Sequence, residues 1–255
     1  MRRSLEMRVL YRDDVVLAID KPAGVLTVPG RGDDAGEALS QQVQAIAKGA
    51  LPVHRLDRDT SGVVLFALGR EAHRALNEAF ESRRAEKTYL ALVRGDLEGS
   101  ARCERPLVEG RRGNMRVADA GNARAQRART DFAPVERFGD VTWCSCKPLT
   151  GRTHQVRVHL AALGHPLLVD PRYAESRPIL RRELHAGAQD PDAVALGRTP
   201  LHASALRLPH PTKRGFLQVE APLPEDLATC LELLRAARRE AAISSARAPG
   251  SSRPP

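Results

Sequence analysis

The stretch His54-Arg55-Leu56-Asp57-Arg58-Asp59-Thr60-Ser61-Gly62 is followed directly by the apolar run Val63-Val64-Leu65-Phe66-Ala67-Leu68. An apolar run of this length, bounded by turn residues, predicts a fully buried strand. The stretch before it gathers cations, carboxylates and hydroxyls within a few residues. The sequence therefore predicts a polar loop at the mouth of a rigid core element, a common place for catalytic residues.

Hydrophobic periodicity on both sides of this stretch predicts an α+β fold, because many strands occur with few, scattered helices. Strands are expected near residues 15–19, 25–28, 88–93, 143–147, 203–208 and 216–219. Helices are expected at 39–46, 72–80, 153–163 and 227–234. No internal repeat or domain boundary is visible. We expect one domain over residues 1–240 and a disordered tail over 241–255, which offers only small core-forming residues near its end.

Two segments depart from this regular pattern. Residues 101–129 hold eight Arg against Glu104, Glu109 and Asp119, a local net charge of 8 − 3 = +5. Their weak periodicity predicts an excursion or hairpin, either lying along a nucleic acid or simply solvated. Residues 174–199 are polar and interrupted by prolines, which predicts an insertion loop.

Overall composition is that of a globular protein, and its basic charge suits a polyanionic partner. The 255 residues carry a net charge of +9, mostly from Arg, whose guanidinium suits phosphate forks and base stacking. Charge alone is equally typical of an Arg-rich chain with no such partner. No apolar stretch reaches the roughly 20 residues needed to span a bilayer, and no signal peptide is visible. We expect a cytoplasmic protein without membrane contact.

The cysteines and histidines do not predict a metal site. Cys103, Cys144, Cys146 and Cys230 form no Cys-x-x-Cys pair, so buried reduced thiols are expected. His154, His159 and His165 have no acidic or cysteine partner at ligand spacing, and we expect them to be structural.

The motif His-Arg-Leu-Asp-x-x-Thr-Ser-Gly resembles the central motif of the RluA family of pseudouridine synthases, and the likeness runs in order over most of residues 8–222. It includes the turn Asp20–Gly24 and Lys87-Thr88-Tyr89. It continues through Gly151–His159, then Gly164-His165-Pro166 with Asp170 and Tyr173, and ends at Leu201-His202-Ala203. The resemblance implies isomerisation of a uridine in RNA, in which the base detaches from its sugar, rotates and rejoins through carbon.

The resemblance also implies a bent, mainly antiparallel sheet with a central RNA-binding cleft and no cofactor or metal. It implies that Asp57 is the catalytic carboxylate, Tyr89 the aromatic residue against the target base, and Arg157 the partner of the aspartate. Arg55 resembles the side chain that enters the space left by the flipped nucleotide. Without this wider pattern, Asp57 would be interpreted as a turn cap and Tyr89 as core packing.

These residue types suit the chemistry. A stacked uridine must be extruded at a cost of about a few kcal/mol before an enzyme can reach it. A guanidinium such as that of Arg157 stabilises a neighbouring carboxylate without giving up a proton. Tyr89 offers a flat face to a base and a hydroxyl for proton transfer. Whether the carboxylate attacks the base or the sugar stays open.

Further basic residues are predicted to bind RNA. They are Arg58 and Arg152, with Arg111, Arg112 and Arg116 in the basic stretch. Neutralising the last three together is expected to weaken RNA affinity and to flatten its salt dependence. Because Lys21-Pro22 lies close to Met1, we expect no N-terminal RNA-binding domain. This places the chain with a compact subgroup acting, as a monomer, on stem-loops of ribosomal or transfer RNA.

Two other functions fit part of the pattern. A non-catalytic RNA-binding or RNA-folding protein would explain the charge, but not the joint presence of Asp57, Tyr89 and Arg157. A base-removing glycosidase would require paired carboxylates, for which Asp57 and Asp59 are the candidates. The three functions differ in their products. A pseudouridine synthase forms pseudouridine, a binding protein leaves the RNA unmodified, and a glycosidase releases uracil.

Overall fold

The computed structural model describes residues 7–30, 38–110 and 114–247. Its strands are β1 Arg8–Arg12, β2 Val16–Lys21, β3 Leu51–Pro52, β4 Ser61–Ala67, β5 Glu86–Arg94, β6 Ala101–Cys103, β7 Leu107–Glu109, β8 Met115–Val117, β9 Thr130–Arg137, β10 Val141–Pro148, β11 Ile179–Leu180, β12 Val194–Leu196, β13 Leu201–Pro209 and β14 Phe216–Glu220. Its helices are α1 Leu39–Ile46, α2 Arg70–Glu81, α3 Gln155–Ala162, α4 Arg181–Leu184 and α5 Glu225–Arg247. The predicted α+β class is confirmed.

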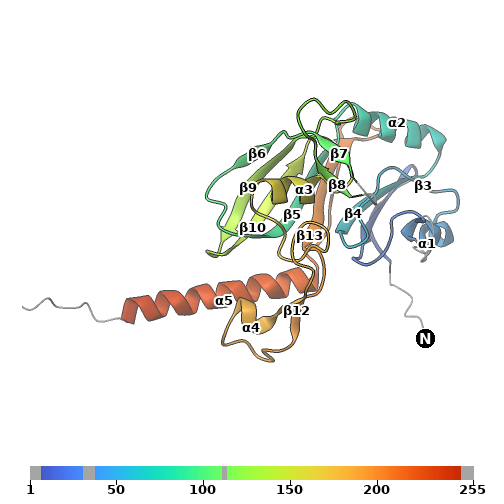
Figure 1. Ribbon diagram of the computed structural model, residues 1–255. Coiled ribbons are helices and arrows are strands. Elements are labelled where there is room, and N and C mark those ends of the chain that lie inside the picture. The colour runs from blue at the N-terminus through green and yellow to red at the C-terminus, as the bar shows by residue number, and fades with distance from the viewer. Residues whose placement is uncertain (1–6, 31–37, 111–113, 248–255) are drawn as a thin grey trace, which may run out of the picture.

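One bent sheet organises the molecule (Figure 1). Its strand order is β1-β2-β4-β13-β5-β10-β9-β6, with β14 added to β13 and β3 to β4. Neighbouring strands are antiparallel except β4 and β13, which pair in parallel over two residues of each strand. The predicted strand 63–68 is β4, which is buried along its whole length. The polar loop therefore leads directly into the middle of the sheet.

The helices pack against different parts of the sheet through separate apolar clusters. Leu39 and Val43 of α1 pack on β2 and β4, whereas Leu76 of α2 packs on the other face of the same strands. The apolar side of α5 begins at Leu227 and packs on β5 and β10. Tyr89 on β5 contacts both the α1 cluster and the α3 cluster. It therefore lies where the two halves of the bent sheet meet.

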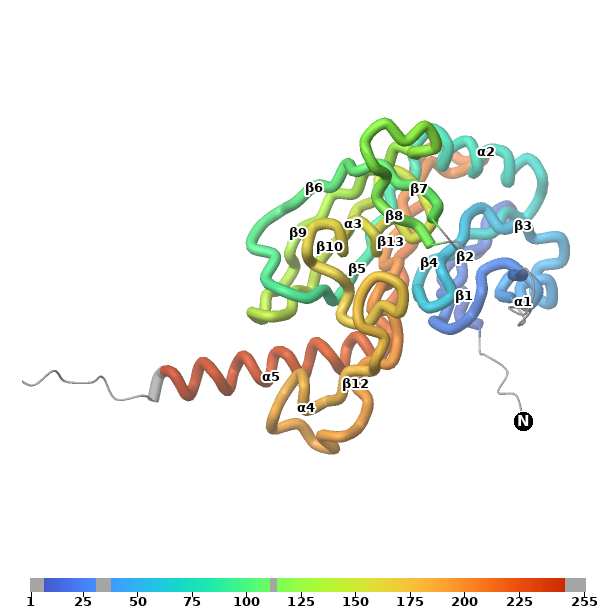
Figure 2. Tube along the Cα trace, in the orientation of Figure 1, coloured from blue at the N-terminus to red at the C-terminus, as the bar shows by residue number. Residues whose placement is uncertain are grey.

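Several sequence predictions require correction. Residues 25–28 do not form a strand, because the carbonyls of Leu26 and Thr27 accept N–H groups at the start of α1 and the Thr27 hydroxyl bonds Leu56. The segment 174–199 is not a plain loop, since β11 and β12 pair within it and α4 lies between them. Residues 241–247, which were expected to be disordered, continue helix α5 to Arg247, and residues 248–255 lie outside the described part. Figure 2 follows α5 as it extends from the body of the molecule.

Gly62 is required where β4 meets β13. Its φ is 113°, and a Cβ there would lie 2.2 Å from the carbonyl oxygen of Ala203. The close approach brings the end of the polar loop against β13, where Ser61 Oγ and His202 Nδ1 share a hydrogen bond of 2.9 Å. A residue without Cβ is thus needed to place the loop.

We expect Gly62→Ala to lower the free energy of unfolding by about 3 kcal/mol, because backbone strain and overpacking add at this position. Gly215→Ala is the matched control, since Gly215 has a similar φ of 102° but no neighbour within 4 Å of a built Cβ. Urea denaturation of the two variants measures the difference. Equal destabilisation would show that steric contact with β13 is unimportant.

Candidate active site

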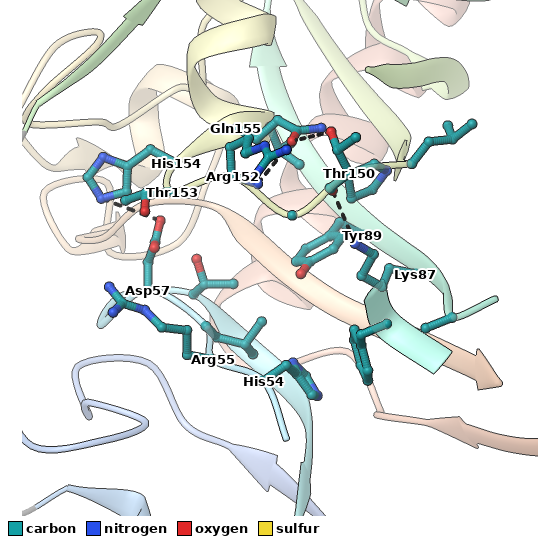
Figure 3. Close-up of a pocket in the computed structure, with 18 of the residues that line it drawn as sticks. His54, Arg55, Asp57, Lys87, Tyr89, Thr150, Arg152, Thr153, His154 and Gln155 are labelled. Atoms are coloured by element: carbon teal, nitrogen blue, oxygen red, sulfur yellow. Dashed lines mark hydrogen bonds and ion pairs between the residues drawn. The ribbon is translucent and has the colours of Figure 1, made fainter. Parts of the chain in front are cut away.

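A cavity of about 530 Å³ lies where the polar loop, the start of β5 and the turn before α3 meet (Figure 3). Asp57, Tyr89 and Arg157 all line it, although they come from three separate parts of the chain. Asp57 lies on the loop before β4, Tyr89 on β5 and Arg157 on α3. The fold therefore brings the three predicted catalytic residues to one cavity.

Asp57 and Arg157 are in direct contact. Nη1 of Arg157 donates a hydrogen bond of 3.0 Å to Oδ2 of Asp57. The Asp57 side chain is 22% exposed, whereas that of Arg157 is 7% exposed. The carboxylate is thus open to the cavity while the cation that stabilises it is buried behind it. This arrangement leaves Oδ1 of Asp57 available to a reacting atom.

Asp170 holds the guanidinium of Arg157 from the opposite side. Arg157 donates from Nε to Oδ2 of Asp170 at 2.8 Å and from Nη2 to Oδ1 at 2.7 Å, a bidentate pair. The Asp170 side chain is 1% exposed. Its Oδ1 also accepts the backbone N–H groups of Arg172 and Tyr173, at 2.9 and 3.3 Å. Asp170 therefore fixes Arg157 with one N–H side aimed at Asp57.

Arg157 is the cation between the two carboxylates of this group. Burial opposes ionisation of Arg157, but the hydrogen bonds and charges of Asp170, together with the charge of Asp57, outweigh burial and raise its pKa above the usual value. Arg157 remains a cation at every pH at which the protein is folded. It is attracted to both carboxylates and holds them on either side of its guanidinium.

His154 is a second polar neighbour of Asp57. Its Nε2 lies 3.7 Å from Oδ2 of Asp57, and its Nδ1 lies 2.8 Å from the hydroxyl of Tyr173. That hydroxyl accepts the backbone N–H of Met115 on β8 at 3.1 Å, so its own proton is available to Nδ1 of His154. Burial lowers the pKa of His154, which favours the neutral ring. The proton of the neutral ring is then on Nε2, facing Asp57.

Tyr89 forms an aromatic wall of the cavity, and its ring lies across from Asp57 in Figure 3. Burial raises the pKa of its hydroxyl above the ordinary value, and the negative charge of Asp57 raises it further. Tyr89 is thus neutral near pH 7. Its flat face and O–H group are available to a base that enters the cavity.

Lys21 supports the loop that carries Asp57. It is 0% exposed, and its Nζ donates to the backbone carbonyls of Pro22, Val25 and Arg58, at 2.9, 2.7 and 2.8 Å. Burial lowers its pKa to about 7, against the opposing charges of Asp59 and Asp57. Because it joins residues 22–25 to residue 58, Lys21 fixes the loop from beneath.

The residues predicted to bind RNA separate into two groups. Arg55 and Arg152 are exposed and line the cavity, and Nε of Arg152 donates to the carbonyl of Arg127 at 3.2 Å. Arg58 is exposed but is not a lining residue. Arg116 is exposed on β8, away from the cavity lining, and pairs with Asp119 at 2.8 Å. Arg111 and Arg112 lie outside the described residues.

No group of histidine, cysteine and acidic residues suited to a metal ion is found in the described part of the chain. His159 is fully buried between Thr130 Oγ1 and the carbonyl of Arg105, and His165 bonds the carbonyl of Arg94. Both rings are held by hydrogen bonds within the fold. His154 was also expected to be only structural, but it faces the cavity. All four cysteines are buried thiols without disulfides.

Sequence reasoning assigned no role to Lys21, His154, Asp170 or Tyr173 at this site. Each belongs to a motif that carries the family resemblance, so the motifs were the available signal. The missing information was spatial, since Asp57 and Arg157 are 100 residues apart.

A search of the described residues finds no helix long and apolar enough to cross a membrane.

The comparisons with known proteins agree with this geometry. The family described as RNA pseudouridylate synthase matches residues 15–162. The chain is 39% identical over 238 residues to "Ribosomal large subunit pseudouridine synthase C" of Escherichia coli K12, and this alignment covers 90% of the chain and 70% of that protein. It is 37% identical over 242 residues to "Ribosomal large subunit pseudouridine synthase D" of Nitrosomonas europaea, and that alignment covers 91% of the chain and 66% of the relative.

Solved structures show the same architecture. "Human RNA Pseudouridylate Synthase Domain Containing 1" superposes with a TM-score of 0.67 at 30% identity, over 91% of this chain and 95% of that one. Fold and sequence thus define an isomerase that acts on RNA. The chain belongs to the RluA family of pseudouridine synthases.

Proposed function

We propose that this protein converts uridine to pseudouridine in large-subunit ribosomal RNA and that Asp57 is its catalytic carboxylate. The observation that carries the proposal is the 3.0 Å contact between Asp57 and Arg157 in a cavity that Tyr89 also lines. The ribosomal target rests on the names of the two bacterial relatives. A carboxylate held by a permanent cation and open to an aromatic-lined cavity suits attack on a nucleotide.

The site residues supply distinct parts of the reaction. The bond from N1 of uracil to C1′ of ribose breaks, the base turns, and C5 bonds to C1′ while the C5 proton leaves and N1 gains a proton. Asp57 forms the bond that holds one fragment, either the sugar or the base, during the exchange. Tyr89 stacks against the uracil, and Arg157 stabilises the carboxylate whenever it is released.

The base must leave its helix to reach Asp57, because the cavity is lined on several sides by protein. Arg55 is exposed at the cavity, two residues before Asp57. Its planar guanidinium can stack and donate hydrogen bonds in the gap left by the base. In this proposal Arg55 offsets part of the cost of extrusion.

The direct test incubates the purified protein with unmodified large-subunit ribosomal RNA and, separately, with unmodified transfer RNA. Modified positions are mapped with a pseudouridine-selective carbodiimide. We expect discrete modified uridines in the ribosomal RNA. Modification of transfer RNA alone would contradict the proposed target. Binding without modification would support the non-catalytic alternative, and released uracil would support the glycosidase.

A further inference from the structure

Arg83 has a backbone conformation that is unusual for an arginine. It follows the last residue of α2 by two positions and has a φ of 60°, in the left-handed region. Its N–H donates to the carbonyl of Phe80 at 3.1 Å, and the N–H of Arg84 donates to Ala79 at 2.8 Å. Such a helix ending favours glycine in the left-handed position, because a Cβ there is strained. An arginine at this position costs stability, and side-chain function is a physical reason for it.

Arg83 is one of the residues that line the cavity. Arg83 is exposed and lines the same cavity as Asp57 and Tyr89. Among the described residues, no ion pair or hydrogen bond is found for its guanidinium. Its neighbour Arg84 is different, since it pairs with Glu78 at 3.1 Å and does not line the cavity. Arg83 therefore presents an uncommitted positive charge to the cavity.

Two of the other lining cations, Arg157 and Lys87, already have protein partners. Arg157 donates to both Asp57 and Asp170. Nζ of Lys87 donates to the carbonyl of Thr150 at 3.1 Å, and burial lowers the pKa of Lys87 to about 8. Ala85 and Lys87, which lie between Arg83 and Tyr89 in the sequence, also line the cavity, and Arg83 lies in the turn that joins α2 to β5.

We propose that Arg83 binds a backbone phosphate of the RNA strand next to the uridine held at Asp57. This inference rests on the proposed function. A nucleotide at Tyr89 is joined to neighbours whose phosphates must leave the cavity along its walls. A guanidinium without a protein partner forms a charge-assisted bidentate contact with a phosphate. The left-handed turn is what places Arg83, and not Arg84, on the cavity side.

Arg83→Gly tests this proposal, because the proposal predicts that this substitution stabilises the protein but weakens its binding to RNA. Relief of the strain raises the melting temperature by about 2–4 °C. Loss of the phosphate contact weakens RNA binding about tenfold at 0.1 M salt and makes the slope of log affinity against log salt shallower by about 0.7–0.9.

Three further variants separate charge from backbone conformation. Arg83→Asn keeps a residue that tolerates the left-handed region but removes the charge, so RNA binding weakens as in Arg83→Gly. Arg83→Lys keeps the charge and therefore the salt slope. Arg84→Ala, the matched control one residue away, leaves RNA affinity unchanged.

Binding is measured by fluorescence anisotropy with a labelled ribosomal RNA stem-loop, separately from turnover. If Arg83→Gly and Arg83→Asn both bind RNA with the affinity and salt slope of the wild type, the inference is overturned. A wild-type protein that binds this RNA but forms no pseudouridine refutes the proposed activity alone, because the role of Arg83 is judged by affinity.

Discussion

Asp57→Asn abolishes pseudouridine formation while the protein stays folded and binds RNA. We expect the turnover number to fall by a factor on the order of 10⁴ or more, since an amide can neither attack carbon nor stabilise a cationic sugar. The fold survives because Arg157 keeps its bidentate pair with Asp170, and because Asp57 itself is partly exposed. Tritium release from C5-labelled uridine in RNA measures the loss, and anisotropy measures binding.

Asp59→Asn is the matched control for this substitution. Asp59 lies in the same loop and carries the same charge, but it is not among the residues that line the cavity. We expect its activity to stay within about threefold of the wild type, within the spread of an ordinary surface substitution. A glycosidase that uses Asp57 and Asp59 as a pair would lose activity in both variants. Full activity of Asp57→Asn would contradict the catalytic assignment outright.

Asp170→Asn lowers both stability and turnover. Breaking a buried ion pair costs about 3–5 kcal/mol, and Asp170 is buried with two hydrogen bonds to Arg157. The amide of the variant also turns an N–H group toward the N–H groups of the guanidinium. Arg157 then loses its fixed position beside Asp57, and we expect the turnover number to fall about 100-fold. Urea denaturation and steady-state kinetics measure the two effects.

The kinetic result distinguishes a positioning residue from a purely structural one. Measured well below the melting temperature, the turnover number should fall while KM for RNA changes little, because Asp170 does not line the cavity. Asp131→Asn is the control, since Asp131 pairs with Arg102 in similar geometry at 2.7 Å but is 35% exposed. We expect that substitution to cost less than about 1 kcal/mol. Equal losses of stability in the two variants would contradict the importance of burial.

Local sequence pattern was sufficient for most elements of the central sheet. The run Val63–Leu68 predicted β4 because an unbroken apolar segment must be buried on both faces. The spacing of Ala72, Leu76 and Ala79 predicted α2 for the same kind of reason. Errors occurred where periodicity was weak. Residues 25–28 are short and mostly apolar, yet their carbonyls accept hydrogen bonds from Lys21 and from the start of α1, and the Thr27 hydroxyl bonds Leu56 in the loop that carries Asp57.

The sequence predicted only those parts of the candidate site that belong to recognisable motifs. They identified Asp57, Tyr89 and Arg157 as residue types suited to this chemistry, but not their distances or partners. They also missed Arg83, because a left-handed backbone at an arginine has no signature in composition or periodicity. That feature depends on how α2 ends against β5.

By itself the sequence determined the buried strand, the polar loop before it and the family to which the chain belongs. Only the tertiary structure decided which side chains meet, because contacts such as Asp57 with Arg157 join positions 100 residues apart. Periodicity indicates which face of an element is buried. The bend of the sheet and the parallel pairing of β4 with β13 determine which other elements that face contacts. The supporting roles of Lys21, Asp170 and His154 therefore became visible only in three dimensions.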